Sequence, residues 1–166
     1  MNTNLRTALA IASLLLAVAC GKSDNDTADV SGTTEPVAAA PATASGALPR
    51  TPSVDGAYVH FVTPRDGDTV SNPVILNFAV TGMGVAPAGD NTPKTGHHHV
   101  IIDADLPAMD MPIPADAKHI HFGDGSSTAE LTLEPGEHTL QLVFADHLHI
   151  PHEPPVYSDR ITITVE

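Results

Sequence analysis

Residues 96–103 have the sequence GHHHVIID, in which three consecutive histidines are followed by an apolar run and an aspartate. Three histidines run directly into three branched apolar residues, which is the composition of a buried β-strand. Successive side chains of a strand point to opposite faces of the sheet. One face therefore takes His97, His99 and Asp103, and the other face takes His98. The stretch predicts a central strand that carries imidazoles on both of its faces.

The segments around this strand predict an all-β domain over residues 56–166. Residues 139–145 and 161–165 alternate between apolar and polar side chains, as half-buried strands do. Turns rich in Pro, Gly, Asp and Asn separate such runs, and no segment has helical periodicity. Roughly seven or eight short strands indicate an immunoglobulin-like antiparallel β-sandwich, with a small β-barrel as the alternative. Residues 106–117 and 146–158 are rich in proline and are expected to be irregular.

The N-terminus has the pattern of a bacterial lipoprotein signal. Residues 1–19 contain Arg6 followed by an apolar run, and residues 17–20 (AVAC) resemble a lipobox. We therefore expect Cys20 to be lipidated and to become the first mature residue; the alternative is an ordinary signal peptide with a chance cysteine. Several acyl chains would anchor the protein stably in a membrane. Gly21, in place of an aspartate, favours the outer membrane of the bacterial cell envelope, with the protein facing the periplasm.

Residues 20–55 are expected to form a disordered tether behind the lipidated cysteine. The segment consists mainly of Ala, Pro, Thr, Ser, Gly and Asp and has few large apolar residues. Such a composition buries too little surface to offset the entropy of ordering the chain.

Charge and cysteine content exclude two classes of protein. The formal net charge is −13, from 7 Lys and Arg against 20 Asp and Glu, and no basic patch is present. Nucleic acid is therefore excluded as a partner, whereas cations suit such a surface. Because Cys20 is the single cysteine, no intramolecular disulfide can support the fold.

Histidine is the chemical signal of the chain, because nine of its ten histidines lie between residues 96 and 154. Imidazoles from neighbouring strands can converge on one ion, and three or four of them suit copper or zinc. A carboxylate could complete the set. The candidate metal ligands are His97, His99, His119, His121, His147, His149 and His152, with Asp103 and Asp146. Nothing in the sequence shows that the fold itself requires the metal.

Other interpretations of the histidines remain open. They could form a structural hydrogen-bond network, or a pH-responsive or partner-binding surface, since imidazoles titrate near neutrality. We expect His98 to lie in or beside the core and to donate to a backbone carbonyl. His138 is expected to cap a turn or to lie at a sheet edge.

The sequence predicts a binding protein rather than an enzyme. It contains no nucleophile elbow, phosphate-binding loop or dinucleotide motif. The predicted function is that of a cell-envelope lipoprotein whose domain binds copper or zinc for buffering or delivery. The alternative is a non-catalytic interaction module that binds a cell-wall or protein partner through its proline-rich loops. The protein partner itself is unknown.

Several motifs together resemble one family. They are the segments 64–70 (PRDGDTV), 82–89 (GMGVAPAG), 96–99 (GHHH), 113–116 (IPAD), 119–123 (HIHFG), 135–142 (PGEHTLQL) and 146–152 (DHLHIPH). With these motifs the chain is similar to the bacterial domain of unknown function 4399 family. The resemblance implies a small secreted or lipid-anchored β-domain and no assigned activity. The chain departs from the family pattern at residues 124–128, and at Met109 and Met111.

Overall fold

The computed structural model describes residues 48–166 of the chain. The predicted signal segment, Cys20 and the tether up to residue 47 lie outside the described residues. Within the described part, no helix is long and apolar enough to cross a membrane.

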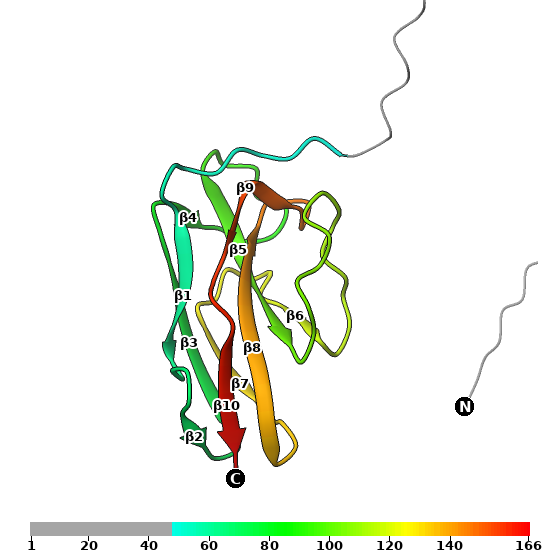
Figure 1. Cartoon of the computed structure of the whole chain (residues 1–166). Coiled ribbons are helices and arrows are strands. Elements are labelled where there is room, and N and C mark those ends of the chain that lie inside the picture. The colour runs from blue at the N-terminus through cyan, green and yellow to red at the C-terminus, as the bar shows by residue number, and fades with distance from the viewer. Residues whose placement is uncertain (1–47) are drawn as a thin grey trace, which may run out of the picture. The chain divides into compact units, whose positions relative to one another are not determined.

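All regular elements of the described part are strands (Figure 1). They are β1 (Tyr58–Thr63), β2 (Thr69–Val70), β3 (Val74–Thr81), β4 (Gly84–Val85), β5 (Thr95–Ile102), β6 (His119–His121), β7 (Thr128–Leu131), β8 (Gly136–Ala145), β9 (Pro151–Tyr157) and β10 (Ile161–Val165). The predicted GHHHVIID strand is β5, and the chain leaves it at Asp103, where φ is +49°.

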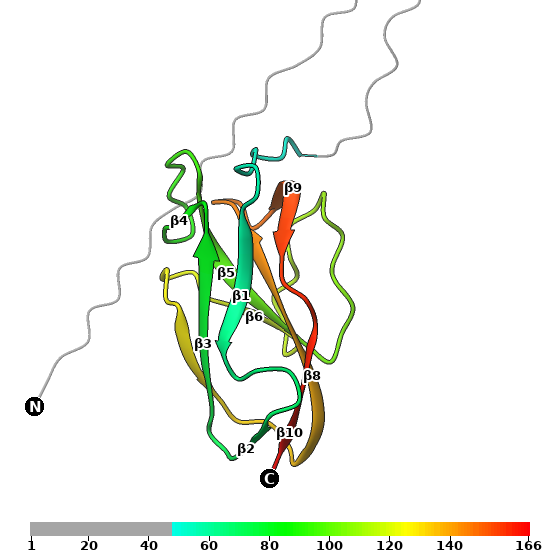
Figure 2. The same ribbon diagram turned by 60° about the vertical axis from the view of Figure 1, so that its left-hand side comes forward.

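The strands form two sheets that lie against each other (Figures 1 and 2). One sheet has three strands in the order β1-β3-β7. The other has seven, in the order β2-β10-β8-β5-β4, with β6 paired to β5 and β9 paired to β8. Pairing is antiparallel except for β2 with β10 and β4 with β5. The predicted all-β sandwich is confirmed, and the two sheets do not close into a barrel.

Strand β9 is an element that the sequence did not predict. Residues 146–158 contain three prolines and were expected to be irregular, yet residues 151–157 are extended and pair with β8. Proline cannot donate a ladder hydrogen bond, so it is confined to edge strands and bulges. β9 meets this condition, because β8 is its only partner among the named strands and its register shifts between Phe144 and Ala145, where a bulge can accommodate the prolines.

The main core lies between the two sheets, and the predicted alternation builds it. β5 and β8 pair antiparallel, so that His98 lies opposite Phe144, and Val100 lies opposite Leu142. These four side chains point inward against β1 and β3 and are almost completely buried. The prediction that His98 lies in the core is confirmed.

A second, smaller core covers the outer face of β5 and β8. The chain between β5 and β6, yellow-green in Figure 1, folds back over this face. Its Ile113 packs with Ile101, Val143 and Ala145. β5 is therefore covered on both faces, and residues 96–102 are buried without alternation. This second layer explains why polar side chains on the outer face of β5 are buried.

Residues 50–53, which lie ahead of the predicted domain start at residue 56, contact strand β9. Pro52 forms a parallel bridge with Glu153 of β9, and the Ser53 amide donates to the Glu153 carbonyl over 2.9 Å. The Glu153 amide donates in turn to the Thr51 carbonyl over 2.9 Å, and the Arg50 guanidinium pairs with the Glu153 carboxylate. We call residues 50–53 the strap. Backbone hydrogen bonds hold it against β9, and no apolar pattern in its sequence (Arg-Thr-Pro-Ser) indicates such bonds.

Candidate metal centre

Two adjacent imidazoles from β5 form the floor of the candidate centre. His97 and His99 are alternate residues of the strand, so both rings lie on its outer face. Their Nε2 atoms are 3.1 Å apart. At a metal–nitrogen distance of about 2.0–2.1 Å, tetrahedral ligands lie roughly 3.3–3.4 Å apart, and ligands at right angles roughly 2.8–3.0 Å apart. In this structure the contact is a hydrogen bond between the two imidazoles, and its length falls between these two values, so the two nitrogens could bind one ion with little movement.

The neighbouring strand β6 supplies a third imidazole. His121 lies directly opposite His99 in the antiparallel register, so both side chains share one face. Its ring centroid lies 4.8 Å from that of His97 and 5.0 Å from that of His99. Gly123 makes room for this ring, because a Cβ atom at Gly123 would lie 2.2 Å from the His121 imidazole. One nitrogen from each of these three histidines lies within 4.8 Å of the other two, so that the group could hold a metal ion.

A fourth imidazole comes from the loop between β8 and β9. The ring centroid of His149 lies 4.7 Å from that of His121, 5.0 Å from His97 and 5.9 Å from His99. His149 has a φ of +66°, which is uncommon for a residue with a side chain. The Asp146 carboxylate holds this conformation, since its Oδ1 accepts hydrogen bonds from the Leu148 and Ile150 amides at 2.9 and 3.0 Å.

Three backbone hydrogen bonds frame the cluster. The Ile113 amide donates to the His149 carbonyl over 2.9 Å, and the Gly89 amide donates to the His147 carbonyl over 3.2 Å. The Ala88 amide donates to the Gly123 carbonyl over 2.9 Å. Inside this frame His97 and His99 are 0 and 1% exposed, whereas His121 is exposed. The cluster therefore has a buried floor and a rim that solvent reaches.

The imidazoles of the floor are held in the neutral form that binds metals. Burial, together with the nearby His121 and His149, lowers the pKa of His97 to about 4. Burial and the other three histidines lower the pKa of His99 to about 2. Burial and His149 also lower the pKa of His121. Near neutral pH, protons therefore compete little for these nitrogens.

The Nδ1 atoms of the two floor histidines accept or donate no hydrogen bond within the described part of the chain. The Nδ1 atoms of His97 and His99 are buried, and among the described residues neither has a hydrogen-bond partner. Ligating histidines usually donate this N–H to a carboxylate or carbonyl, and loss of such a partner weakens metal affinity roughly 10–100-fold. The floor therefore resembles an exchangeable site more than a permanent structural one.

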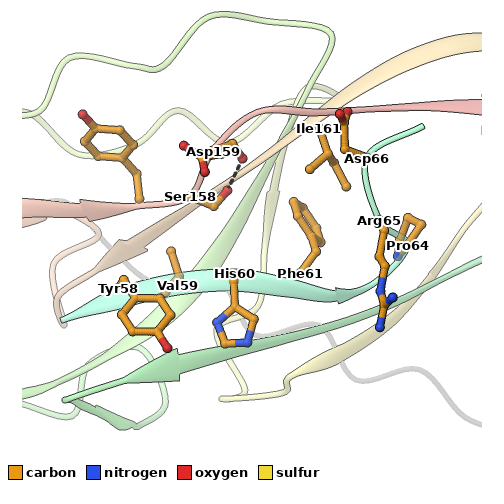
Figure 3. A pocket seen from close by; sticks show the side chains of 11 residues that line it. Tyr58, Val59, His60, Phe61, Pro64, Arg65, Asp66, Ser158, Asp159 and Ile161 are labelled. Atoms are coloured by element: carbon orange, nitrogen blue, oxygen red, sulfur yellow. Dashed lines mark hydrogen bonds between the residues drawn. The ribbon is translucent and has the colours of Figure 1, made fainter. Parts of the chain in front are cut away.

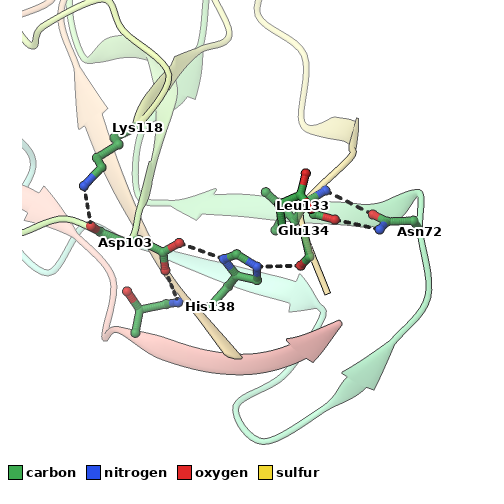
Figure 4. Close-up of polar contacts among 7 residues, drawn as sticks. Asn72, Asp103, Lys118, Leu133, Glu134 and His138 are labelled. Atoms are coloured by element: carbon green, nitrogen blue, oxygen red, sulfur yellow. Dashed lines mark hydrogen bonds and ion pairs between the residues drawn. The ribbon is translucent and has the colours of Figure 1, made fainter. Parts of the chain in front are cut away.

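Two of the predicted ligands are held elsewhere by hydrogen bonds. His119 lies on the same face as His121, but its Nδ1 contacts the Asp116 carboxylate at 2.8 Å. Asp103 accepts a hydrogen bond from the Thr139 amide at 2.8 Å, and its other oxygen contacts His138 Nδ1 at 2.7 Å. Figure 4 shows His138 between Asp103 and the carbonyl of Glu134, which fits the predicted turn-capping role of His138.

The remaining predicted ligands lie beside the cluster rather than in it. Both Asp146 oxygens are occupied, Oδ1 by the loop amides and Oδ2 by the Thr51 hydroxyl at 3.0 Å. His147 lines a cleft of about 550 Å³ together with Thr51 and Lys94. His152 is buried, and its ring stacks on Phe144 at a centroid distance of 5.8 Å. The structure thus brings together His97, His99, His121 and His149 of the nine candidates.

His98 lies on the opposite face of β5 and has no part in the cluster. Its ring packs against Phe78 and Phe144 at centroid distances of 4.7 and 5.0 Å. The predicted hydrogen bond to a backbone carbonyl is wrong, because neither ring nitrogen has a partner among the described residues. The two sheets close tightly over this position and bring apolar side chains to it.

Two residues that shape the cluster were not among the candidates. Gly123 follows the HIHF motif, and a glycine beside a candidate ligand is a usable signal of close packing. Thr51 lies 95 residues from Asp146, and nothing in its local sequence connects the two.

Comparison with known proteins agrees with the resemblance seen in the motifs. The family described as Domain of unknown function (DUF4399) matches residues 76–166, which cover β5, β6 and the loop of His149. Searches of curated proteins and of solved structures found no match to the chain. On the family match, the chain belongs to the DUF4399 family.

Proposed function

We propose that the domain binds one transition-metal ion, Zn(II) or Cu(II), at His97, His99 and His121, with His149 as a fourth ligand. The observation that carries this proposal is the 3.1 Å separation of the Nε2 atoms of His97 and His99 on a buried floor. Imidazoles without a sulfur ligand suit these ions better than Cu(I), Ca²⁺ or Mg²⁺.

The site is built for exchange, which supports buffering or delivery of the metal. Its rim histidines, His121 and His149, are reached by solvent, so an ion has an entry path. The unpartnered Nδ1 atoms of the floor limit the affinity. An anchored lipoprotein facing the periplasm, as the N-terminal sequence predicts, would hold such a buffer at the cell envelope.

Binding rather than catalysis is also part of the proposal. A catalytic triad could in principle be formed by Thr51, Asp146 and His152. In a triad the hydroxyl donates its proton to the imidazole, which is not the arrangement found here. The Thr51 hydroxyl has one proton and donates it to the Asp146 carboxylate at 3.0 Å. His152 Nδ1, 2.8 Å away, must then donate to the hydroxyl, so His152 is not placed to act as a base toward it.

The experiment that tests the proposal is metal analysis of the full-length protein without an affinity tag, purified in detergent. Competition titration with Zn(II) and Cu(II) would then give stoichiometry and affinity. We expect one ion per chain, lost in the His97→Ala/His99→Ala variant and retained in His119→Ala. A failure to bind either ion more tightly than about micromolar would contradict the proposal.

A second candidate function, docking of a protein partner, is favoured by a groove beside β1. The groove has a volume of about 520 Å³ and lies between β1 and the β9–β10 segment (Figure 3). Tyr58 and Tyr157 are 51 and 47% exposed there, and β1 is an edge strand that pairs only with β3 among the described strands. Tyrosine is common at protein interfaces, and edge strands accept extended peptides.

Site-specific photo-crosslinking in the cell envelope tests this second function. A photoreactive residue in place of Tyr58 should capture a defined protein, whereas the same residue at the exposed Ile75 of β3 should not. Equal capture, or none, at the two positions would argue against docking at the groove.

A further inference from the structure

The strap reaches the candidate metal centre through one side chain, that of Thr51. Its hydroxyl lies 3.0 Å from Oδ2 of Asp146 and 2.8 Å from Nδ1 of His152. It donates to the carboxylate and accepts from the imidazole, so all three groups are fixed by two hydrogen bonds. Asp146 and His152 are each 1% exposed, so the Thr51 hydroxyl, and not solvent, is the hydrogen-bond partner of Asp146 Oδ2 and His152 Nδ1 in this structure.

Asp146 connects Thr51 to the loop that carries His149, because one of its carboxylate oxygens binds Thr51 and the other binds the loop. While Oδ2 accepts from Thr51, Oδ1 accepts from the amides of Leu148 and Ile150, the two neighbours of His149. The His149 amide itself donates to the Asp146 carbonyl over 2.9 Å. A residue held at φ +66° depends on such surrounding bonds, because its own backbone preference opposes that conformation.

The strap is well anchored for this purpose. Backbone hydrogen bonds join Thr51 and Ser53 to Glu153, and the Arg50 guanidinium contacts the His152 and Pro151 carbonyls. Thr51 is therefore held from outside the loop, and its hydroxyl can restrain Asp146.

We propose that Thr51 is a positioning residue for the metal centre: through Asp146 it holds the loop in the conformation that presents His149 as the fourth ligand. The strap then latches the site from a part of the chain that lies ahead of the domain's first strand. This inference rests on the proposed metal-binding function, and it adds a residue and a segment that the ligand set does not include.

The test compares Thr51→Val with Thr51→Ser in the full-length protein without a tag. Valine keeps the shape of threonine but removes both hydrogen bonds, whereas serine keeps the hydroxyl. We expect Thr51→Val to weaken Zn(II) binding roughly 10-fold, as loss of an outer-shell partner does, and Thr51→Ser to retain most of the affinity. Ser53→Ala is the matched control, because Ser53 joins the strap to Glu153 through its backbone.

A double-mutant cycle separates positioning of His149 from a general loss of structure. If Thr51 acts through His149, Thr51→Val should have no further effect on affinity in a His149→Ala background. The same loss of affinity in both backgrounds would overturn the inference while leaving the proposed function intact.

Hydrogen exchange of the metal-free protein gives a readout that does not depend on binding. The Leu148 and Ile150 amides should exchange several-fold faster in Thr51→Val than in wild type, whereas amides of β5 should not change. Unchanged exchange at both loop amides would overturn the latch even if metal binding failed, and failure of wild type to bind metal would overturn the proposed function.

Discussion

Strand β5 carries three consecutive histidines, but their surroundings differ between its two faces: His98 lies on the inner face, and His97 and His99 lie on the outer face. On the inner face a single imidazole lies among Phe78 and Phe144 and has no polar partner. On the outer face two imidazoles meet each other and two more from β6 and the β8–β9 loop. His97, His98 and His99 are equally buried, so it is the side chains around each ring, apolar on the inner face and imidazole on the outer face, that determine whether the ring could bind a metal.

The largest effect is expected from removing an imidazole on the outer face of β5. His99→Ala removes one of two floor ligands and should weaken Zn(II) binding by roughly 100-fold or more, above the loss seen for outer-shell partners. His119→Ala is the matched control, because His119 lies on the same face but is held by Asp116. Competition titration measures both; an equal loss in the control would mean that the assigned ligands are not the binding set.

The next effect tests the inner face. His98→Leu replaces two unpartnered buried nitrogens by apolar atoms of similar volume, so it should stabilise the metal-free protein by about 1–3 kcal/mol. Metal affinity should remain that of wild type. Urea unfolding gives the stability change, and a clear destabilisation would show that His98 has a polar role in the core.

These two effects also show what the sequence could and could not predict. Alternation along β5 placed His98 on one face and His97 with His99 on the other, and this prediction is confirmed. Alternation does not give strand order, so the sequence could not show that β6 pairs with β5 and sets His121 opposite His99. It also could not separate His121 from His119, which Asp116 holds.

The loops were harder to predict than the strands, for a physical reason. The conformation of His149 depends on a carboxylate that is fixed in turn by Thr51, and the order of the strap depends on backbone bonds to β9. Strand β9 was not predicted, because its three prolines are typical of irregular segments. Such contacts between distant segments leave no periodic pattern, whereas the apolar alternation of β8 does.

A smaller effect is expected from filling the space around the His121 imidazole on the outer face of β5. Gly123→Ala would place a methyl group 2.2 Å from the His121 imidazole and force the ring away. We expect Zn(II) affinity to fall by about 10-fold, since one ligand is displaced but not removed. Gly84→Ala is the control, since its added methyl would lie 3.2 Å from the Thr95 side chain and would have no histidine within 4 Å. An affinity equal to that of wild type would show that His121 does not bind the ion.

The smallest effect concerns the histidine at the far end of the same sheet. Hydrogen bonds to the Asp103 carboxylate and the Glu134 carbonyl raise the pKa of His138 above its ordinary value of 6.5. A raised folded-state pKa contributes stability that is fully present below pH 6.5 and is lost as the pH rises through the folded value.

Urea midpoints of wild type and His138→Gln, measured from pH 5 to pH 9, test this sign. The difference between the two should shrink above pH 6.5, and Asp103→Asn should reproduce the flatter profile because it removes the same ion pair. A difference that grows with pH would contradict the assignment. The pair is partly exposed, with 15% of the His138 side chain and 41% of the Asp103 side chain accessible, so solvent screening keeps the expected effect small.

The most direct test of the central claim is a crystal structure of the protein soaked with Zn(II), with anomalous difference maps collected at the zinc edge. We expect one strong peak within bonding distance, about 2.0–2.1 Å, of His97 and His99 Nε2, with His121 and His149 around it. We expect no peak at His98. A map without density between His97 and His99, or with its main peak at His119 or His147, would mean that the metal does not bind at the proposed centre.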